Sequence, residues 1–595
     1  MVNVGARCKT SDLGIGLIIY QYSRRLRRHG NILRRIVMLK LLYLLNTFLL
    51  AFGYEPVSKS GFKAWLKLAK AIIRLLQGND LPLSTACVPL RHASPYTHIR
   101  MIGCVLSILI HLKVIELGYT PKGYPLLKLN PLFGGDNTTE KGIRIPKSKP
   151  VHAKGVLGNE DVLECLNYPV IMMGMDTHKD MVKKSPNAEA YWNAVDFIHS
   201  KYQGKAMYIP YYWDFRGRLY ARTDAFNFTS DKTCRSYMTI EGRQTDAWDT
   251  KASGPLLISL MFRDNHALVE LFGLTKEGMK TSAIDPYMSI ASHIPSTILD
   301  NLPTIDENTK TVRLKIKDCT IQYSYCGDAT VKRYFGDAFD AYSTAYAKVM
   351  PKGAEFRYAT INGWNETVSE YNWDMPDGFH VNMPVLKGMY TGYERNPTRV
   401  VLKDLSGKVI ASAICKYTVQ QPIAKKQSGS LGLGANMVHS TDAYLLRELI
   451  RRCKNQFKCS PYFLKSGELK TDSESACKIY ECYKNTGLVS LNVLNYVKPG
   501  DTLPEEYLSE LMRIYKTLPK VGFNIRPVHD EFGIHPEHKE VLVSQFNMLL
   551  SEIYCSNLAE YFMSTQVKGY SVTPGEKDDK VIQAILNNNY LLHKE

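Results

Sequence analysis

The spacing of apolar and polar positions changes along this chain, and the changes mark its elements. Residues 1–130 carry long apolar stretches typical of helices, near 36–53, 62–76 and 101–117. A stretch rich in Gly, Pro and Lys follows over 118–155 and is typical of a linker. Residues 160–205 return to a helical pattern. From Met207 the runs shorten and turn residues separate them, so we expect strands, helices and a hairpin there.

Length and composition fit a folded protein with several subdomains. The chain has 595 residues, of which 45% are hydrophobic and 22% are charged. This length exceeds what one hydrophobic core usually serves, so we expect several subdomains around a shared cleft. Together with the element pattern, it predicts an α+β protein that is mostly helical.

The net charge points to a polyanionic partner. Lys and Arg number 75 against 57 Asp and Glu, which gives a formal charge of +18. A nucleic acid is the first hypothesis, and a basic protein that merely avoids aggregation is the alternative. The Arg-rich residues 1–40 precede an apolar run, Leu41–Gly53, that is too short to span a bilayer. We therefore expect basic helices without stable membrane insertion, with a mitochondrial transit peptide as the alternative.

The cysteines indicate a reducing compartment. There are 13 of them, scattered along the chain, and no two form a CxxC pair. Their one local group has a spacing that is loose for a zinc site: Cys453, Cys459, Cys477 and Cys482. We therefore interpret the cysteines as reduced thiols.

Two aspartates are candidates for metal ligands. Asp249 follows a short strand-like stretch, and Ser253 and Gly254 lead from it into an apolar helix. Asp530 lies in FNIRPVHDEFGIHP, which predicts a strand, a tight turn and a second strand with His-Asp at the tip. Phosphoryl transfer onto a hydroxyl uses divalent ions, and two carboxylates suffice if the fold brings them together. Alone, either Asp is equally typical of a turn or a helix cap.

The segment RLKIKDCTIQYSYCG predicts a helix that lines one channel with Arg313, Lys317 and Tyr325. Residues four apart return to nearly the same helical face, and a residue eight positions further along points only about 80° away from that face. The two cations would hold a triphosphate, and Tyr325 would lie at the helix end, beside base and sugar. A solvated basic helix is the alternative.

Residues 208–221, YIPYYWDFRGRLYA, interleave aromatic rings with Arg216 and Arg218. Flat rings such as that of Tyr220 beside guanidinium groups suit a nucleic-acid path, through stacking and phosphate contacts. Gly217, between the two arginines, lets the backbone come close to a ligand. A buried aromatic strand with outward-reaching arginines is the alternative.

Together these segments resemble the single-subunit DNA-directed RNA polymerases of phages and mitochondria. Four motifs occur in the family's order: DFRGRLYA at 214–221, Asp249 with Ser253 and Gly254, the RxxxKxxxxxxxY spacing of Arg313, Lys317 and Tyr325, and His529 with Asp530. Further likeness lies in DPYMSIA, which holds Tyr287, and in the segment GLGANMVHSTD, which holds His439. The last residues, ILNNNYLLHKE, resemble the family's C-terminal foot.

The resemblance implies a right-hand polymerase, with palm, fingers and a reduced thumb, behind a helical N-terminal domain. The implied divisions are a basic helical N-terminal domain (1–130), a linker with thumb-like helices (131–206), the first part of the palm (207–299), fingers with the nucleotide helix and a specificity hairpin (300–440), and the second part of the palm (441–595), which includes an inserted segment (451–520) and the foot. The short N-terminal region and the close spacing of Arg218 and Asp249 indicate a reduced or divergent member.

The implied reaction is DNA-templated addition of ribonucleoside monophosphates to an RNA 3′ end, with release of pyrophosphate. The implied site residues are Asp249 and Asp530 for two Mg²⁺ ions, Arg313 and Lys317 for the triphosphate, Tyr325 and His439 for the ribose 2′-hydroxyl, and Tyr287 near the incoming nucleotide. Lys317 and Tyr325 would take part in catalysis with the two aspartates. Implied partners are the DNA template, the RNA product, rNTPs and an accessory protein for promoter opening. The expected location is the cytoplasm of a host bacterium, with the mitochondrion as the alternative.

Residues 398–418, TRVVLKDLSGKVIASAICKYT, predict two strands joined by a turn at Asp404–Gly407. They lie where the family carries its promoter-specificity hairpin. A two-stranded ribbon fits a major groove, where base edges are distinguishable. Arg399, Lys403 and Lys408 are expected to reach bases or phosphates, and a plain surface hairpin is the alternative.

Three other interpretations stay open. A family A DNA polymerase shares the nucleotide-helix spacing and a VHDE motif, although DFRGR and NMVHSTD argue against it. A catalytically inactive relative would bind nucleic acid without chemistry, although Asp249, Lys317 and Asp530 are all present. A basic scaffold without activity would have no reason to place these motifs in order.

Overall fold

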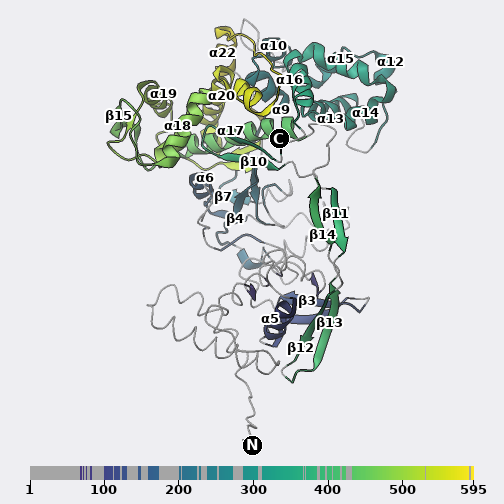
Figure 1. Ribbon diagram of the computed structural model, residues 1–595. Helices are drawn as coiled ribbons and strands as arrows, with labels where there is room; N and C mark the ends of the chain where they lie inside the picture. Colours follow the sequence, from purple (N-terminus) through teal and green to yellow (C-terminus); the bar gives the residue numbers. More distant parts are fainter. Residues whose placement is uncertain are drawn as a thin grey trace, which may run out of the picture.

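The computed structural model describes most of residues 99–594 and a few positions before them (Figure 1). The longer gaps in this description are 130–144, 151–158, 173–197, 230–237, 273–285 and 424–431. The described part is mostly helical, with small and almost entirely antiparallel sheets, which confirms the expected α+β class. In the part of the chain that the structure describes, no helix has the length and apolar character needed to cross a bilayer.

A four-stranded antiparallel sheet joins segments that lie far apart in the chain, in the order β17-β18-β8-β19. Its strands are β8 (Asp246–Thr250), β17 (Arg526–Val528), β18 (Glu531–Ile534) and β19 (Leu591–Lys594). Because side chains alternate between the faces of a sheet, Trp248 and its partner Phe532 lie on one face and are buried in the core. Asp249 and its partner Glu531 lie on the other face. The strand–turn–strand pattern predicted around Asp530 is confirmed by β17 and β18.

Three helices form the core beside this sheet: α9 (Ser253–Met261), α17 (Leu433–Lys454) and α20 (Lys539–Cys555). Every described residue of α9 is buried, as expected of a helix that is apolar all round. The helix α17 has 22 residues and contacts both of the others. Since α9 begins a few residues after Asp249, this packing fixes the position of the sheet relative to α17.

A second group of helices packs against α9 through α13 and α16 and has its own core. Its members are α11 (Pro286–Ala291), α12 (Ser296–Leu299), α13 (Val312–Ser324), α14 (Ala329–Phe335), η3 (Gly336–Ala338), α15 (Phe339–Val349) and α16 (Pro351–Asn362). The Thr311 side chain caps α13 by accepting a hydrogen bond from the backbone of Leu314. Buried tyrosines of α15 bond to α13, because Tyr342 donates to Thr320 and the Tyr346 hydroxyl bonds to that of Ser324.

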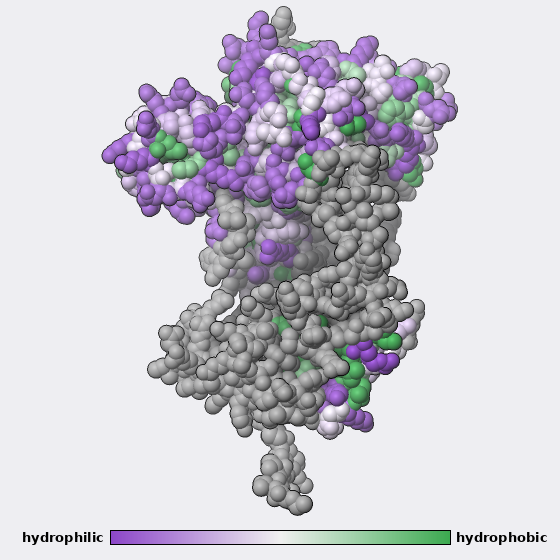
Figure 2. All heavy atoms as spheres, in the orientation of Figure 1, coloured by the Kyte–Doolittle hydropathy of each residue, from purple (hydrophilic) through white to green (hydrophobic). Residues whose placement is uncertain are grey.

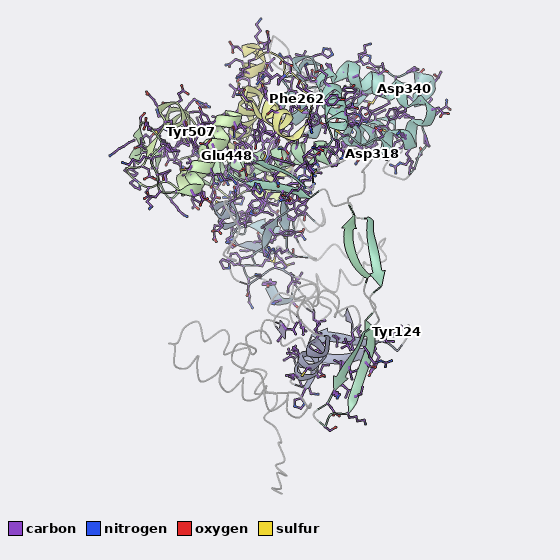
Figure 3. All side chains as sticks on the ribbon, in the orientation of Figure 1. Tyr124, Phe262, Asp318, Asp340, Glu448 and Tyr507 are labelled. Carbon is purple, nitrogen blue, oxygen red and sulfur yellow. The ribbon has the colours of Figure 1, made fainter. Side chains whose placement is uncertain are left out.

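The segment after α17 forms a unit with its own core. It contains η4 (Pro461–Phe463), β15 (Lys465–Ser466), α18 (Glu474–Thr486), η5 (Leu491–Asn495), β16 (Thr502–Leu503) and α19 (Glu505–Tyr515). Glu448 of α17 anchors it, because its carboxylate accepts hydrogen bonds from the Ser490 hydroxyl and the Leu491 backbone. Figure 3 labels Glu448 together with Tyr507, which α19 contributes to this core.

The N-terminal part combines a helix with a three-stranded sheet. Its described elements are β1 (Leu81–Pro82), α5 (Ile99–His111), β2 (Ile115–Tyr119) and β3 (Pro125–Leu129). The apolar stretch 101–117 is therefore not one helix. The chain turns at Lys113, which has a φ of 56°, and continues as a strand. Most of the other helices expected in residues 1–98 lie outside the described residues.

Two pairs of strands follow between the helical body and the N-terminal part (Figure 1). In one pair β11 (Met389–Glu394) lies beside β14 (Thr418–Ile423), and in the other β12 (Thr398–Lys403) lies beside β13 (Val409–Cys415). This confirms the hairpin predicted over 398–418. At its tip the Asp404 carboxylate accepts hydrogen bonds from the backbones of Ser406 and Lys408.

Short elements complete the body around the central sheet. They are α6 (Glu160–Cys165), β4 (Val170–Met172), β5 (Tyr211–Trp213), β6 (Leu219–Ala221), β7 (Met238–Ile240), α10 (Asn265–Phe272), β9 (Glu370–Asp374), β10 (His380–Pro384), η6 (Pro536–His538), α21 (Leu558–Gln566) and α22 (Asp579–Leu586). On the face drawn in Figure 2, the described surface of this body is largely hydrophilic.

Candidate functional site

The central sheet relates the two segments predicted to carry metal ligands through its register. Asp249 is partly exposed near the end of β8. His529 and Asp530 lie outside the described residues, but they connect Val528 to Glu531, whose backbones pair. Glu531 is in turn the register partner of Asp249. The topology therefore sets the immediate chain neighbour of Asp530 opposite Asp249.

A second carboxylate, which the sequence did not single out, shares this face of the sheet. Glu531 is buried and pairs with Arg526 at 3.5 Å, with both side chains 5% exposed or less. The Arg526 side chain lies over Gly533, where an added Cβ would meet its Nε at 2.3 Å. Because Glu531 is paired with Arg526 inside the protein, we interpret it as part of a structural ion pair of the sheet. Asp249 is partly exposed and offers the carboxylate oxygens that Mg²⁺ prefers.

The helix α13 carries the predicted cations on one exposed side. Arg313 and Lys317 are exposed, whereas Lys315 is buried and donates a hydrogen bond to the Leu302 carbonyl at 2.6 Å. The Arg313 guanidinium lies 5.4 Å from the ring centre of Tyr287. Tyr287 is only 5% exposed, so its ring supports Arg313 and has little surface left for a ligand. The helix face predicted for Arg313 and Lys317 is thus confirmed.

Tyr325 ends α13 as its C-cap, as predicted, and its ring is held from two sides. A Cβ added to Gly254, at the start of α9, would lie 2.3 Å from the Tyr325 hydroxyl. The His439 ring meets the Tyr325 ring edge-on, with 4.8 Å between the ring centres. Gly254 follows Asp249 closely in the chain, so Tyr325 lies against the segment that leaves β8.

The DFRGR segment is a tight turn between β5 and β6. Asp214 organises the turn, because its Oδ1 accepts hydrogen bonds from the backbones of Arg216 and Arg218. Its Oδ2 forms an ion pair with the Arg216 side chain at 2.6 Å. Gly217 has a φ of 83°, a left-handed conformation that favours glycine. Tyr220 lies on β6, with its ring centre 5.9 Å from that of Tyr212.

One side of α17 holds this turn through three contacts. His439 Nδ1 lies 2.9 Å from the Arg216 guanidinium, and Asp442 pairs with Arg218 at 2.6 Å. Arg447 donates a hydrogen bond to the carbonyl of Gly217 at 2.9 Å. Arg216 and Arg218, expected along a nucleic-acid path, are thus each paired with a carboxylate and only about one-fifth exposed.

Arg447 is itself held by a buried charge network. Its guanidinium binds Asp377 through two hydrogen bonds, of 2.5 and 2.9 Å, and Arg451 reaches the same carboxylate at 3.2 Å. Burial would raise the pKa of Asp377, but the two guanidinium groups outweigh it and hold the pKa below its usual value. Sequence reasoning missed Asp442 and Arg447, although both share a helix with His439. Asp377 gives no sequence signal of its own.

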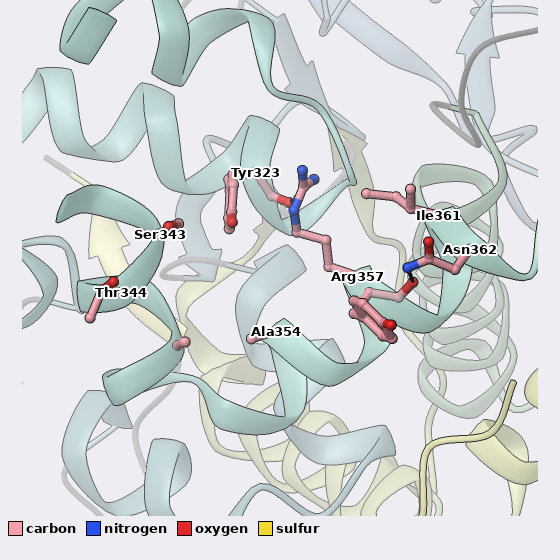
Figure 4. Close-up of a pocket in the computed structure, with 9 residues that line it drawn as sticks. Tyr323, Ser343, Thr344, Ala354, Arg357, Ile361 and Asn362 are labelled. Atoms are coloured by element: carbon pink, nitrogen blue, oxygen red, sulfur yellow. Dashed lines mark hydrogen bonds between the residues drawn. The ribbon is translucent and has the colours of Figure 1, made fainter. Parts of the chain in front are cut away.

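A cavity of about 500 Å³ opens on the other side of α13 (Figure 4). Tyr323 and Arg357 line it, together with residues of α15 and α16. The Arg357 guanidinium lies 4.0 Å from the ring centre of Tyr323 and forms an ion pair with Asp328. Arg357, the one cation among the described residues that line this cavity, is already paired with Asp328, so we do not expect the cavity to bind a triphosphate.

The hairpin β12–β13 has one face in the N-terminal core. Val400 and Leu402 are buried there against α5, and the Ser107 hydroxyl accepts a hydrogen bond from the backbone of Lys403. Arg399 and Lys408 are exposed. The hairpin therefore has one face in the N-terminal core and exposes the cations Arg399 and Lys408.

The described candidate residues fall into separate groups. His439 contacts both Arg216 and Tyr325. Arg313 and Lys317 lie further along α13, and the hairpin cations belong to the N-terminal part. No protein-family model matches this chain, and no curated protein matches its sequence.

Proposed function

We propose that this chain catalyses DNA-templated RNA synthesis by nucleotidyl transfer from ribonucleoside triphosphates. The observation that carries the proposal is the register of the central sheet, in which Asp249 faces Glu531, the residue after Asp530. Two segments that look like metal motifs in the sequence are thereby neighbours in the fold. Carboxylates brought close together can hold the two metal ions that two-metal phosphoryl transfer uses.

In this proposal Asp249 and Asp530 hold Mg²⁺. When bound, the ions activate the attacking 3′-hydroxyl and neutralise the charge on the leaving pyrophosphate. Arg313 and Lys317 bind the triphosphate, which is supported by their exposure on one side of α13. Because α13 packs on α9, the helix that follows β8, these cations belong to the same body as Asp249.

Tyr325 and His439 orient the sugar in this proposal. The Tyr325 ring is fixed by Gly254 and by the His439 ring, and His439 is fixed by Arg216. Such a chain of contacts holds a hydroxyl in place before substrate arrives, which favours a ribose that can bond to it. The central sheet then serves as palm and α13–α16 as part of the fingers. The exposed cations of β12–β13 serve as DNA contacts.

The test is extension of an RNA primer on a DNA template with Asp249→Asn. The variant keeps the shape of the side chain but loses the charge that Mg²⁺ needs, so extension should fall by roughly 100-fold or more. Asp246→Asn is the matched control, because Asp246 lies on the same strand but on the opposite face. It should extend at the wild-type rate.

Scaffold binding should stay the same in both variants. Near-normal extension by Asp249→Asn would refute the proposed site. Equal losses in the two variants would make the effect of the Asp249 change a structural one.

A further inference from the structure

Three potential metal ligands gather at the end of β18 that lies away from Asp530. They are His535, Glu537 and His538, and their ligand atoms all lie within 4.8 Å of one another. The group sits where β18 ends and η6 leads into α20. None of its members has a role in the function proposed above.

His535 is held in the orientation that a metal ligand needs. It is 7% exposed, and its Nε2 lies 3.2 Å from the carbonyl oxygen of Ile240. A carbonyl can only accept a hydrogen bond, so Nε2 carries the proton and Nδ1 keeps its lone pair in the neutral ring. Metal-binding histidines typically donate their other ring N–H to a backbone carbonyl in this way.

The other two ligands are also oriented by the protein. The His538 ring stacks on Phe523, with 4.2 Å between ring centres and 11° between planes. The Glu537 carboxylate pairs with Arg243 at 2.6 Å, with side chains 45% and 58% exposed. A surface ion pair of this kind is weak, so a metal ion can displace Arg243.

We infer that His535, Glu537 and His538 form a zinc site, completed by a water molecule. Two imidazoles and one carboxylate are a usual ligand set for Zn²⁺, whereas Mg²⁺ prefers oxygen ligands alone. Around a tetrahedral ion with bonds of about 2.0–2.1 Å, ligand atoms lie roughly 3.3 Å apart, so the side chains close by roughly 1.5 Å at most. All three ligands lie between β18 and α20, so the ion would tie the end of β18 to η6.

Equilibrium dialysis of the full chain against Zn²⁺, after removal of bound metal with a chelator, tests the site. Wild type should bind one more Zn²⁺ per chain than His538→Ala. Glu537→Gln replaces a carboxylate ligand by a neutral amide. It should weaken binding of that ion by at least the roughly 10- to 100-fold that loss of an outer-shell partner costs. Neither residue is buried, so both variants should fold.

Two further variants separate a metal site from a structural ion pair. His293→Ala removes an exposed histidine elsewhere and should bind as wild type does. Arg243→Gln releases the Glu537 carboxylate and should bind Zn²⁺ as tightly as wild type or more tightly. Equal Zn²⁺ stoichiometry in wild type and His538→Ala would overturn the inference. Weaker binding by Arg243→Gln would overturn it too, because the ion pair would then be what organises Glu537.

Discussion

Replacing Gly254 by Ala should impair catalysis by displacing Tyr325, without unfolding the chain. A Cβ at this position would lie 2.3 Å from the Tyr325 hydroxyl and 2.8 Å from Cζ. Ordinary contacts of a Cβ begin at 3.4 Å. Because α9 is closely packed and cannot give way, the Tyr325 ring must move by about 1 Å.

The expected loss of rate follows from that displacement. A shift of about 1 Å in a positioning group can cost roughly 100-fold, which corresponds to about 2.7 kcal/mol in the activation free energy. The effect on stability is smaller. Overpacking costs about 1–3 kcal/mol, and Ala gains about 1 kcal/mol over Gly in a helix. A net loss of about 2 kcal/mol or less leaves a typical domain folded.

The assay is primer extension by wild type, Gly254→Ala, Tyr325→Ala and the double variant. With no ring to displace, Gly254→Ala should cost almost nothing in the Tyr325→Ala background. Gly118→Ala is the control, since its Cβ would meet nothing closer than 3.4 Å. Wild-type activity of Gly254→Ala would refute this reasoning. The reasoning would also be refuted if the double variant were 100-fold slower than Tyr325→Ala, a difference of about 2.7 kcal/mol in activation free energy.

Three more predictions concern the sugar, the buried charges and the hairpin. Tyr325→Phe should keep RNA synthesis but discriminate less against dNTPs, and an unchanged rNTP/dNTP ratio would contradict this. Asp377→Asn should lower the free energy of unfolding by roughly 3–5 kcal/mol near pH 7, because Arg447 and Arg451 lose a buried counter-charge. Since the pKa of Asp377 is held below 3.8, that stabilisation is present above this value and fades as the pH falls through the folded pKa. Urea titrations near pH 7 and about pH 3 should show the difference shrinking. Replacing Asp404–Lys408 with Gly and Ser should abolish promoter-directed initiation but spare extension of a preassembled RNA–DNA scaffold, and loss of both activities would make the hairpin purely structural.

Local periodicity made several elements predictable from the sequence. The spacing of Arg313 and Lys317 places both on one side of α13, as the structure has it. The hairpin around 398–418 and the β17–β18 pair follow from alternating apolar residues on either side of turn residues. An apolar run alone is less informative, which is why 101–117 divides into α5 and β2 although its pattern suggests one helix.

Pairings between distant segments could not be predicted in the same way. Nothing in the sequence indicates that Asp377 binds Arg447, or that Asp442 binds Arg218, because each charge has many partners of the opposite sign to choose from. For the same reason, the sequence does not show that Arg216 and Arg218, expected to face nucleic acid, form ion pairs within the protein. The register that sets Glu531 against Asp249 likewise depends on the whole sheet.

The most direct test of templated RNA synthesis gives the purified chain an RNA primer on a DNA template, Mg²⁺ and one nucleotide at a time. Templated synthesis predicts that only the complementary rNTP is added, that each addition releases one pyrophosphate, and that the matching dNTP is a poor substrate. Addition that ignores the template base, preference for the dNTP, or no addition with any nucleotide would contradict the proposed function.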